Sequence, residues 1–462
     1  MNPRGRPAER VLGLGRLHAE VSLARIQMEP FTKALVVEQP HPALDDHLRE
    51  IGIEPVRLRE VPDEEALVEA LQDTGAQVLF KRSRVPVTRS IVEQCPDLYA
   101  VQLCSIGTDS VDLQACAEHG VLVFNDPVSN GRSVVELAVG HMIALSRRLY
   151  ETDVQMHHSE WAKSSSGRYE VRGKRLGIVG LGNIGRAVAK VAEELGLEVL
   201  FHDTRPVAVE VGTEMGWQPV PDLEALFRTV DIVTVHTSAK DTWGKSNSGL
   251  LDGVLGQLGA ERPENSPRVF LNLARGNLHT SEALLDAVRS GAVRRAAVDV
   301  YEEEPAPGQR DWQNPYADEP RVSCTPHIGA ATQEAQPRIA RRVAGTMAGF
   351  SRFGSIRDCV FGPRSQMSVR ANARGHVVLA VVHSVARGTK KAVDDAIYEA
   401  EASNLGSSHR DFDIGVAYDL SVLDRPLSRE ELERLAERSK EIARDPEAVK
   451  VIRQIVVPAP GF

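Results

Sequence analysis

The stretch Leu176–Asp203, LGIVGLGNIGRAVAKVAEELGLEVLFHD, decides the fold of this chain. It reads as an apolar strand, a turn with the pattern G-x-G-x-x-G, an amphipathic helix and a second strand that ends at an acid. Glycine-rich turns are common in structural loops. Here, however, every part stands in the order that a dinucleotide-binding βαβ unit requires. The stretch therefore predicts a parallel α/β sheet that binds a dinucleotide.

Each residue of the turn has a physical task. Gly180 allows a tight turn, Gly182 lets the backbone approach a pyrophosphate, and Gly185 lets helix and strand pack closely. Asp203 is placed to bind ribose hydroxyls, which favours NAD because the 2′-phosphate of NADP would meet a like charge. Arg205 leaves two alternatives open, a contact with such a phosphate or a solvated surface position. The predicted cofactor-binding residues here are Gly180, Gly182, Asn183, Ile184, Gly185 and Asp203.

Composition limits the class of protein. A length of 462 residues allows two or three domains, and a net charge of −9 argues against a nucleic-acid partner. No apolar run approaches the roughly 20 residues of a membrane span. The 5 cysteines form no C-x-x-C pair and no zinc-binding spacing. We therefore expect reduced thiols, a cytoplasmic location and no metal, nucleic-acid or membrane partner.

Strands alternate with helices on both sides of the glycine turn, which predicts two parallel-sheet layers. The expected organisation is a disordered extension over 1–30, a substrate-binding domain over 31–128 and 329–355, a dinucleotide-binding domain over 129–328, a linker over 356–369 and a regulatory domain over 370–462. Within the dinucleotide-binding domain, residues 249–258 are expected to be helical.

Three polar residues stand at or just beyond the ends of predicted strands: Arg275, Glu304 and His327. Ligands bind outside the carboxyl ends of strands in an open α/β sheet, so the three are expected to converge. A histidine suits removal of a hydroxyl proton, a carboxylate orients it, and an arginine grips a substrate carboxylate. Taken singly, each residue also has a structural explanation. His327 could be a capping or core histidine, Glu304 could belong to a solvated acidic run, and Arg275 could belong to a turn. Together they predict hydride transfer on a 2-hydroxy acid.

A series of motifs in this order resembles the NAD-dependent D-2-hydroxyacid dehydrogenases, and within that family the phosphoglycerate-oxidising members. The motifs are Ile106-Gly107-Thr108-Asp109, Ser129-Asn130-Gly131-Arg132-Ser133-Val134, the glycine turn, Asn272-Leu273-Ala274-Arg275-Gly276, Asp299-Val300-Tyr301 and Thr325-Pro326-His327-Ile328-Gly329. The resemblance implies two Rossmann-like domains, the substrate domain being flavodoxin-like. It also implies catalytic roles for the three residues named above.

The resemblance extends to the ligand contacts. It implies further cofactor-binding residues, namely His236, Ala274 and Asp299, the last beside the nicotinamide carboxamide. It implies a substrate site at Arg82, Ser83, Ser105, Ile106, Gly107, Thr108 and Asn130. Arg82 is the first candidate for a substrate phosphate, because paired guanidinium donors match phosphate geometry, with Arg84 and Arg132 behind it.

The tail predicts a βαββαβ ferredoxin-like unit and resembles an ACT domain, the amino-acid-sensing module of some family members. Its candidate effector residues are His383 and Asn404, although the effector loop carries Val385 where the family has an asparagine. The alternative to effector binding is that His383 is a buried histidine whose hydrogen bonds are satisfied within the protein. The resemblance also implies a homo-oligomer, a dimer or tetramer.

Three functions are consistent with these patterns. The first is NAD-dependent oxidation of 3-phospho-D-glycerate, the opening step of serine synthesis. The second is another reaction of the same mechanism, as in a glyoxylate/hydroxypyruvate reductase or a 2-hydroxyglutarate dehydrogenase. The third is an NAD-sensing corepressor-like binding protein with little turnover. A phosphate contact at the pocket mouth would separate the first from the second.

Overall fold

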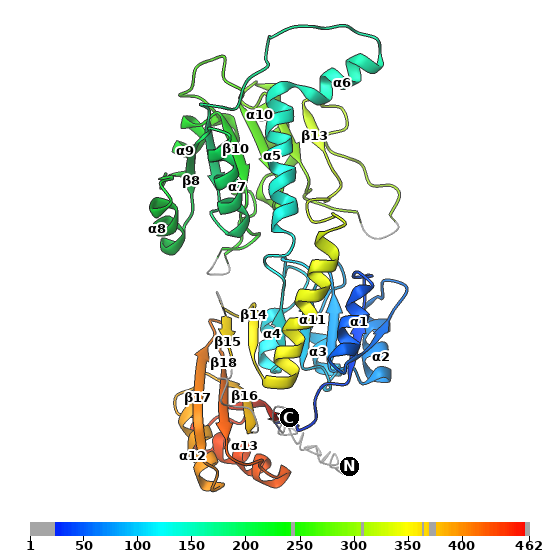
Figure 1. Cartoon of the computed structure of the whole chain (residues 1–462), viewed down its shortest axis with the longest axis vertical. Helices are drawn as coiled ribbons and strands as arrows, with labels where there is room; N and C mark the ends of the chain where they lie inside the picture. Colours follow the sequence, from blue (N-terminus) through cyan, green and yellow to red (C-terminus); the bar gives the residue numbers. More distant parts are fainter. Residues whose placement is uncertain (1–23, 242–244, 306–308, 363–364, 369–375, 458–462) are drawn as a thin grey trace, which may run out of the picture. The chain divides into compact units, whose positions relative to one another are not determined.

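The computed structural model describes residues 24–241, 245–305, 309–362, 365–368 and 376–457 (Figure 1). The chain divides into two compact units. The larger unit comprises Glu29–Asn372 and Phe412–Ile414, and the smaller unit comprises Met1–Met28, Ala373–Asp411 and Gly415–Phe462. None of the helices within the described residues is long and apolar enough to cross a membrane.

The first sheet of the larger unit has the strand order β15-β14-β6-β5-β4-β2-β3. Its parallel strands are β2 (Lys33–Val36), β3 (Glu54–Arg57), β4 (Val78–Lys81), β5 (Ala100–Leu103) and β6 (Leu122–Phe124). Its helices are α1 (Ala43–Glu50), α2 (Glu64–Thr74), α3 (Arg89–Gln94), α4 (Leu113–Glu118) and α11 (Ala335–Phe353), and α11 packs against α1 (Figure 1). The parallel strands follow the flavodoxin-like order, as the sequence predicted.

The segment expected to be a linker, 356–369, instead extends this sheet. Its strands β14 (Ile356–Cys359) and β15 (Ser365–Met367) pair antiparallel with each other, and β14 pairs antiparallel with β6. Without β14 the outer edge of β6 would leave backbone hydrogen-bonding groups unpaired. The side chains of Ile356 and Cys359 are buried, which adds apolar contact to the pairing.

The second sheet is wholly parallel, with the order β13-β12-β11-β10-β7-β8-β9. Its strands are β7 (Arg175–Val179), β8 (Glu198–His202), β9 (Gln218–Pro219), β10 (Ile232–Val235), β11 (Val269–Asn272), β12 (Arg295–Val298) and β13 (Val322–Cys324). Its helices are α5 (Gly131–Arg147), α6 (Leu149–His157), α7 (Asn183–Glu194), α8 (Pro206–Glu214), α9 (Leu223–Thr229) and α10 (Ser281–Arg289). Strand order reverses at β7, the position at which dinucleotide-binding sheets hold their cofactor.

The helix expected over residues 249–258 is wrong. The segment forms successive turns with one short 3₁₀ helix, η1 (Leu255–Gln257). Gly249, Gly253 and Gly256 weaken a regular helix, because each glycine costs about 1 kcal/mol relative to alanine. Leu251 and Leu255 are nevertheless buried, so the apolar spacing reflects core contact rather than helical structure.

The smaller unit is a βαββαβ fold, as predicted for the tail. Its elements are β16 (Val377–Ser384), α12 (Thr389–Glu399), β17 (Asn404–Asp411), β18 (Val416–Leu423), α13 (Arg429–Ala443) and β19 (Val449–Val456). The strands pair antiparallel in the order β19-β16-β18-β17, and β17 and β18 form the expected hairpin.

Part of the expected disordered extension belongs to this sheet. Arg25–Gln27 form strand β1, which pairs in parallel with the edge strand β19. Ile26 and Met28 pack against the apolar cluster of the smaller unit, which explains why this short segment is ordered. The remainder of the expected extension, residues 1–23, lies outside the described residues.

Candidate active site

The glycine turn joins β7 to α7 in the conformation that its sequence predicts. Gly180 has a φ of 91°, and a Cβ atom there would lie 2.8 Å from the His236 carbonyl oxygen. A Cβ on Gly185 would lie 2.2 Å from the Gly180 carbonyl oxygen. A Cβ on Gly182 would meet nothing within 4 Å, so the space beside the N-terminus of α7 is open. Two glycines thus shape the turn, and the third leaves room for a pyrophosphate.

Asp203 follows β8 directly and lies against the glycine turn. Its carboxylate accepts hydrogen bonds from the Leu181 N–H at 2.8 Å and from the Arg205 Nε and Nη2 atoms at 2.9 and 2.7 Å. Burial acts to raise the pKa of Asp203, but the hydrogen bonds and charge of Arg205 outweigh it and lower that pKa. Arg205 pairs with Asp203 while its side chain stays 41% exposed, so a solvated position and a contact with a 2′-phosphate both remain open.

His236 borders the same turn, and Ala274 follows β11, two strands away from β7. His236 follows β10, its N–H donates to the Val179 carbonyl oxygen at 2.7 Å, and its Nε2 lies 3.0 Å from the Thr234 hydroxyl. Burial lowers the pKa of His236 to about 4, so the ring is neutral at physiological pH. Ala274 is almost fully buried at the end of β11.

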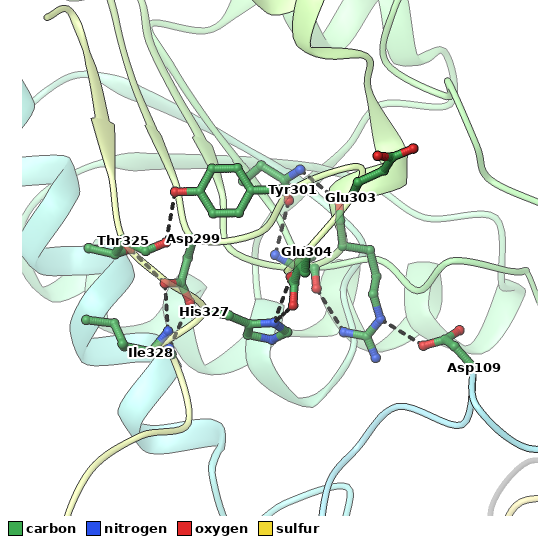
Figure 2. Close-up of polar contacts among 12 residues, drawn as sticks. Asp109, Asp299, Tyr301, Glu303, Glu304, Thr325, His327 and Ile328 are labelled. Carbon is green, nitrogen blue, oxygen red and sulfur yellow. Dashed lines mark hydrogen bonds and ion pairs between the residues drawn. The ribbon is translucent and has the colours of Figure 1, made fainter. Parts of the chain in front are cut away.

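His327 and Glu304 form a close pair, and they point toward each other in Figure 2. The Nδ1 atom of His327 lies 2.8 and 2.9 Å from the two carboxylate oxygens of Glu304. Both side chains are about half exposed, at 48% and 40%. Because Nδ1 is engaged, Nε2 is the ring atom that is left to exchange a proton with a ligand.

Asp299 supports the turn that carries His327 (Figure 2). This buried carboxylate accepts hydrogen bonds from the Thr325 hydroxyl at 2.7 Å and from the N–H groups of Ile328 and Gly329, each at 2.8 Å. The Tyr301 hydroxyl donates to the Thr325 carbonyl oxygen at 3.1 Å. The sequence assigned Asp299 to the cofactor alone and missed this support, although the match Asp299-Val300-Tyr301 was a local signal.

Arg275 lies against the loop expected to bind the substrate. Its Nε donates to Asp109 Oδ2 at 3.2 Å, and a Cβ on Gly107 would lie 2.5 Å from its Nη2 atom. A Cβ on Gly276 would lie 1.8 Å from the Tyr301 carbonyl oxygen. The turn after β11 therefore contacts the turn after β12, which leads to Glu304.

Two residues that the sequence did not single out, Glu38 and Lys81, hold the turn at Arg82–Arg84, which is part of the predicted substrate site. The Glu38 carboxylate accepts hydrogen bonds from the Arg82 and Arg84 N–H groups, each at 2.6 Å. The fully buried Lys81 donates from Nζ to the Ser110 hydroxyl at 2.6 Å. Burial lowers the pKa of Lys81 to about 8, while the Glu38 carboxylate acts in the opposite direction. The signals in the sequence were the positions of Glu38, just after β2, and Lys81, at the end of β4.

The predicted substrate residues offer unsatisfied polar groups. Within the described part of the chain, the buried Ser105 Oγ and Asn130 Oδ1 atoms have no hydrogen-bond partner. The Ile106 carbonyl oxygen is held by Asn125 Nδ2 at 2.7 Å. Ser83 is exposed, and Arg82 and Thr108 are partly exposed. Unpaired buried polar atoms are uncommon in proteins, and a bound ligand is one explanation for them.

The two candidate effector residues lie apart within one chain. His383 pairs with Ala417 near one end of β18, whereas Asn404 pairs with Leu423 at the other end, about 20 Å away at strand spacing. His383 is buried, with Nδ1 2.7 Å from the Ser384 carbonyl oxygen and Nε2 2.9 Å from Asp419. A single effector pocket that uses both residues would need two copies of the chain.

Comparisons with known proteins show the family of this chain. Residues 139–329 match the family model for the NAD-binding domain of D-isomer-specific 2-hydroxyacid dehydrogenases. The D-3-phosphoglycerate dehydrogenase of Dictyostelium discoideum is 31% identical over 401 residues, 86% of this chain and 93% of that protein. This chain belongs to the D-isomer-specific 2-hydroxyacid dehydrogenase family. It is an NAD-dependent dehydrogenase, and its cofactor is NAD.

Another relative and two solved structures also cover much of the chain. The D-3-phosphoglycerate dehydrogenase of Escherichia coli K12 is 32% identical over 397 residues, 85% of this chain and 90% of that protein. The crystal structure of the TT0316 protein from Thermus thermophilus superimposes with a TM-score of 0.58 at 27% identity, over 69% of this chain and 96% of that one. A glyoxylate reductase from Paecilomyes thermophila, at 22% identity and a TM-score of 0.62, shares the fold over 72% of this chain and 98% of that one.

Proposed function

We propose that this dehydrogenase oxidises 3-phospho-D-glycerate to 3-phosphooxypyruvate, the first step of serine synthesis. The reaction type is carried by the His327–Glu304 pair, because a carboxylate-held imidazole suits removal of a hydroxyl proton. The substrate is supported by the relatives, which are named D-3-phosphoglycerate dehydrogenases. Asn130, Ser105 and the 105–108 loop supply polar groups for the substrate carboxylate.

In the proposed mechanism His327 Nε2 removes the proton from the C2 hydroxyl of the substrate. Glu304 holds Nδ1 and stabilises the imidazolium that forms. Arg275 binds the substrate carboxylate and polarises the C2 oxygen through its guanidinium donors. Bound NAD⁺ would supply the hydride acceptor, so that the C2 hydroxyl would become a carbonyl.

Arg82 is the proposed contact for the substrate phosphate. Among the described residues its side chain has no acidic partner, whereas Arg132 is paired with Glu136. The Glu38 carboxylate fixes the backbone of the Arg82 turn, which reduces the entropy lost when the guanidinium binds an anion. Arg82 is partly exposed and lies on a turn fixed by Glu38, so its guanidinium suits a phosphate better than that of Arg132, which is already paired with Glu136.

Steady-state kinetics with NAD⁺ tests the function. We expect turnover of 3-phospho-D-glycerate to exceed that of D-glycerate and 2-hydroxyglutarate. Arg82→Ala should raise KM for the phosphorylated substrate, and Arg132→Ala should not. A preference for an unphosphorylated 2-hydroxy acid would favour the reductase or 2-hydroxyglutarate alternatives. Binding of NAD without turnover of any substrate would favour a corepressor-like role.

Assembly, regulation and location are part of the same proposal. The exposed edge strand β17 offers backbone groups for pairing between copies, which supports a homo-oligomer with the smaller unit as an ACT-type regulatory domain. Asn404 of one copy would then lie near the His383 end of the neighbouring sheet, where an amino-acid effector would bind. The 5 cysteines are free thiols, which supports a reducing compartment such as the cytoplasm. Light scattering at increasing protein concentration, with and without serine, tests assembly and effector binding.

A further inference from the structure

Two histidines of the smaller unit meet a buried aspartate between them. His383 of β16 lies with Nε2 2.9 Å from Asp419 Oδ2, and His409 of β17 lies with Nδ1 2.6 Å from Asp419 Oδ1. The two rings stack with centroids 5.7 Å apart. The side chains of His383 and Asp419 are 2% and 1% exposed, whereas that of His409 is 32% exposed. The cluster is therefore buried but open to solvent on one side.

The outer nitrogen of each ring already has an acceptor. His383 Nδ1 lies 2.7 Å from the Ser384 carbonyl oxygen, which can only accept, so this nitrogen carries a proton. His409 Nε2 lies 2.9 Å from Asp411 Oδ1, so the exposed Asp411 carboxylate can accept a proton from Nε2 when Nδ1 faces a metal ion. In the tautomers with outer N–H groups, the lone pair of each neutral ring faces Asp419. Histidines that bind metals almost always donate their other N–H to a carbonyl or carboxylate in this way.

With the outer N–H tautomers, the two inner nitrogens have no proton to donate to Asp419. Both inner nitrogens would need a second proton in order to donate to Asp419, which makes two imidazolium ions around one buried carboxylate. Lys390 Nζ lies 3.7 Å from Asp419 Oδ2 and is thus, among the described residues, the nearest cationic neighbour of this carboxylate apart from the two histidines. A divalent ion replaces the two inner protons at equal total charge. Lys390 then remains paired with Asp394, at 2.7 Å.

We propose that His383 Nε2, His409 Nδ1 and the Asp419 carboxylate bind a divalent transition-metal ion of the Zn²⁺ class, with a further position open toward solvent. The three donor atoms lie within 4.8 Å of one another. Zinc bonds of about 2.0–2.2 Å place ligand atoms roughly 3.3 Å apart, so the inner pairs need to open by about half an ångström. The exposed edge strand β17 permits that shift. The sequence predicted no metal on the basis of the cysteine spacing alone. The ligands proposed here come from three separate strands, β16, β17 and β18, so no local motif indicates them.

The test uses the full-length protein after removal of metals with a chelator. Calorimetric titration with ZnCl₂ should show one tight site per chain, and CoCl₂ should give the visible absorption of a low-coordinate Co²⁺ site. His409→Ala should abolish this binding. Asp411→Asn keeps all three ligands and changes only an exposed side chain, so it should fold normally and weaken binding roughly 10- to 100-fold.

His327→Ala is the matched control, because it removes another exposed, carboxylate-paired histidine from the larger unit. It should retain the zinc site, while circular dichroism checks that each variant is folded. The proposal is overturned if the wild type takes up neither ion, if His409→Ala binds Zn²⁺ as the wild type does, or if His327→Ala alone loses the site.

Discussion

Asp299 accepts the N–H groups of the two residues that follow His327, each at 2.8 Å. It also accepts the Thr325 hydroxyl at 2.7 Å, so it holds the chain on both sides of the histidine. His327 has a φ of 53°, a conformation uncommon for residues with a side chain. The buried carboxylate compensates this strain with three hydrogen bonds. The position of the imidazole thus depends on a residue that does not touch it.

Asp299→Asn should loosen this turn. One oxygen becomes an amide NH₂ that faces a backbone or hydroxyl donor, which costs about 1–3 kcal/mol in the free energy of unfolding. Misplacement of His327 should lower kcat roughly 10- to 100-fold. Urea denaturation and steady-state kinetics measure the two effects. An unchanged kcat in the folded variant would remove the positioning role.

His327→Ala should lower kcat about a hundredfold or more, the usual contribution of a general base. Glu304→Gln keeps one hydrogen-bond acceptor for Nδ1 but loses the charge that stabilises the imidazolium, so we expect a smaller loss. Glu303→Gln, a change to the neighbouring exposed acid, is the matched control and should leave kcat unaltered. Equal kcat values for Glu303→Gln and Glu304→Gln would contradict the proposed role of Glu304 in supporting His327.

Gly107→Ala should displace the Arg275 guanidinium, because the new methyl group would lie 2.5 Å from Nη2. The end of an arginine side chain can move, so the fold should survive while substrate binding suffers. We expect KM for the 2-hydroxy acid to rise about tenfold or more, as with loss of one charged hydrogen bond. KM for NAD⁺ should stay constant. A thermal melt matching the wild type would show that the effect is local.

Asp203→Ala should narrow the preference for NAD⁺ over NADP⁺. It removes the carboxylate that repels a 2′-phosphate and releases the Arg205 guanidinium that is now bound to it. The ratio of kcat/KM values for the two cofactors measures the change. The double variant with Arg205→Ala should lose the gain on NADP⁺. If the double variant and Asp203→Ala had equal kcat/KM values for NADP⁺, Arg205 would not contribute to NADP⁺ binding.

Lys81 should make stability rise with pH between about 8 and its ordinary pKa near 10.5. Burial lowers the pKa of the folded state, so in this window the unfolded chain binds more protons and folding gains up to about 3 kcal/mol. Buried thiols act in the opposite direction, because burial raises the pKa of Cys104 and Cys359 to about 12. Urea denaturation of Lys81→Met at pH 7 to 10 isolates the lysine. Identical pH slopes in both proteins would refute this role.

Local patterns in the sequence were enough for the fold class. The glycine turn, the alternation of apolar strands with helices and the βαββαβ tail depend on contacts between neighbouring elements, which the periodicity of one segment reflects. The closeness of Glu304 and His327 followed from their places beyond strand ends, since the ends of parallel strands share one edge.

Other features depended on residues far apart in the chain. Strands β14 and β15 formed where a linker was expected, because the open edge of β6 needed a partner. The glycine-rich segment 249–258 became turns although its leucines stayed in the core. Strand β1 was ordered by the edge of β19. Pairing of this kind cannot be read from a single segment.

The sequence by itself determined the dinucleotide-binding turn at Gly180–Gly185 and the order along the chain of the proposed catalytic residues Arg275, Glu304 and His327. Only the tertiary structure decided which donors and acceptors meet: Glu38 with the Arg82 turn, Asp109 with Arg275, and Asp419 with His383 and His409. Strand register and loop packing set those contacts to within a fraction of an ångström, whereas a pattern of residue types constrains only which face or end of an element a side chain occupies.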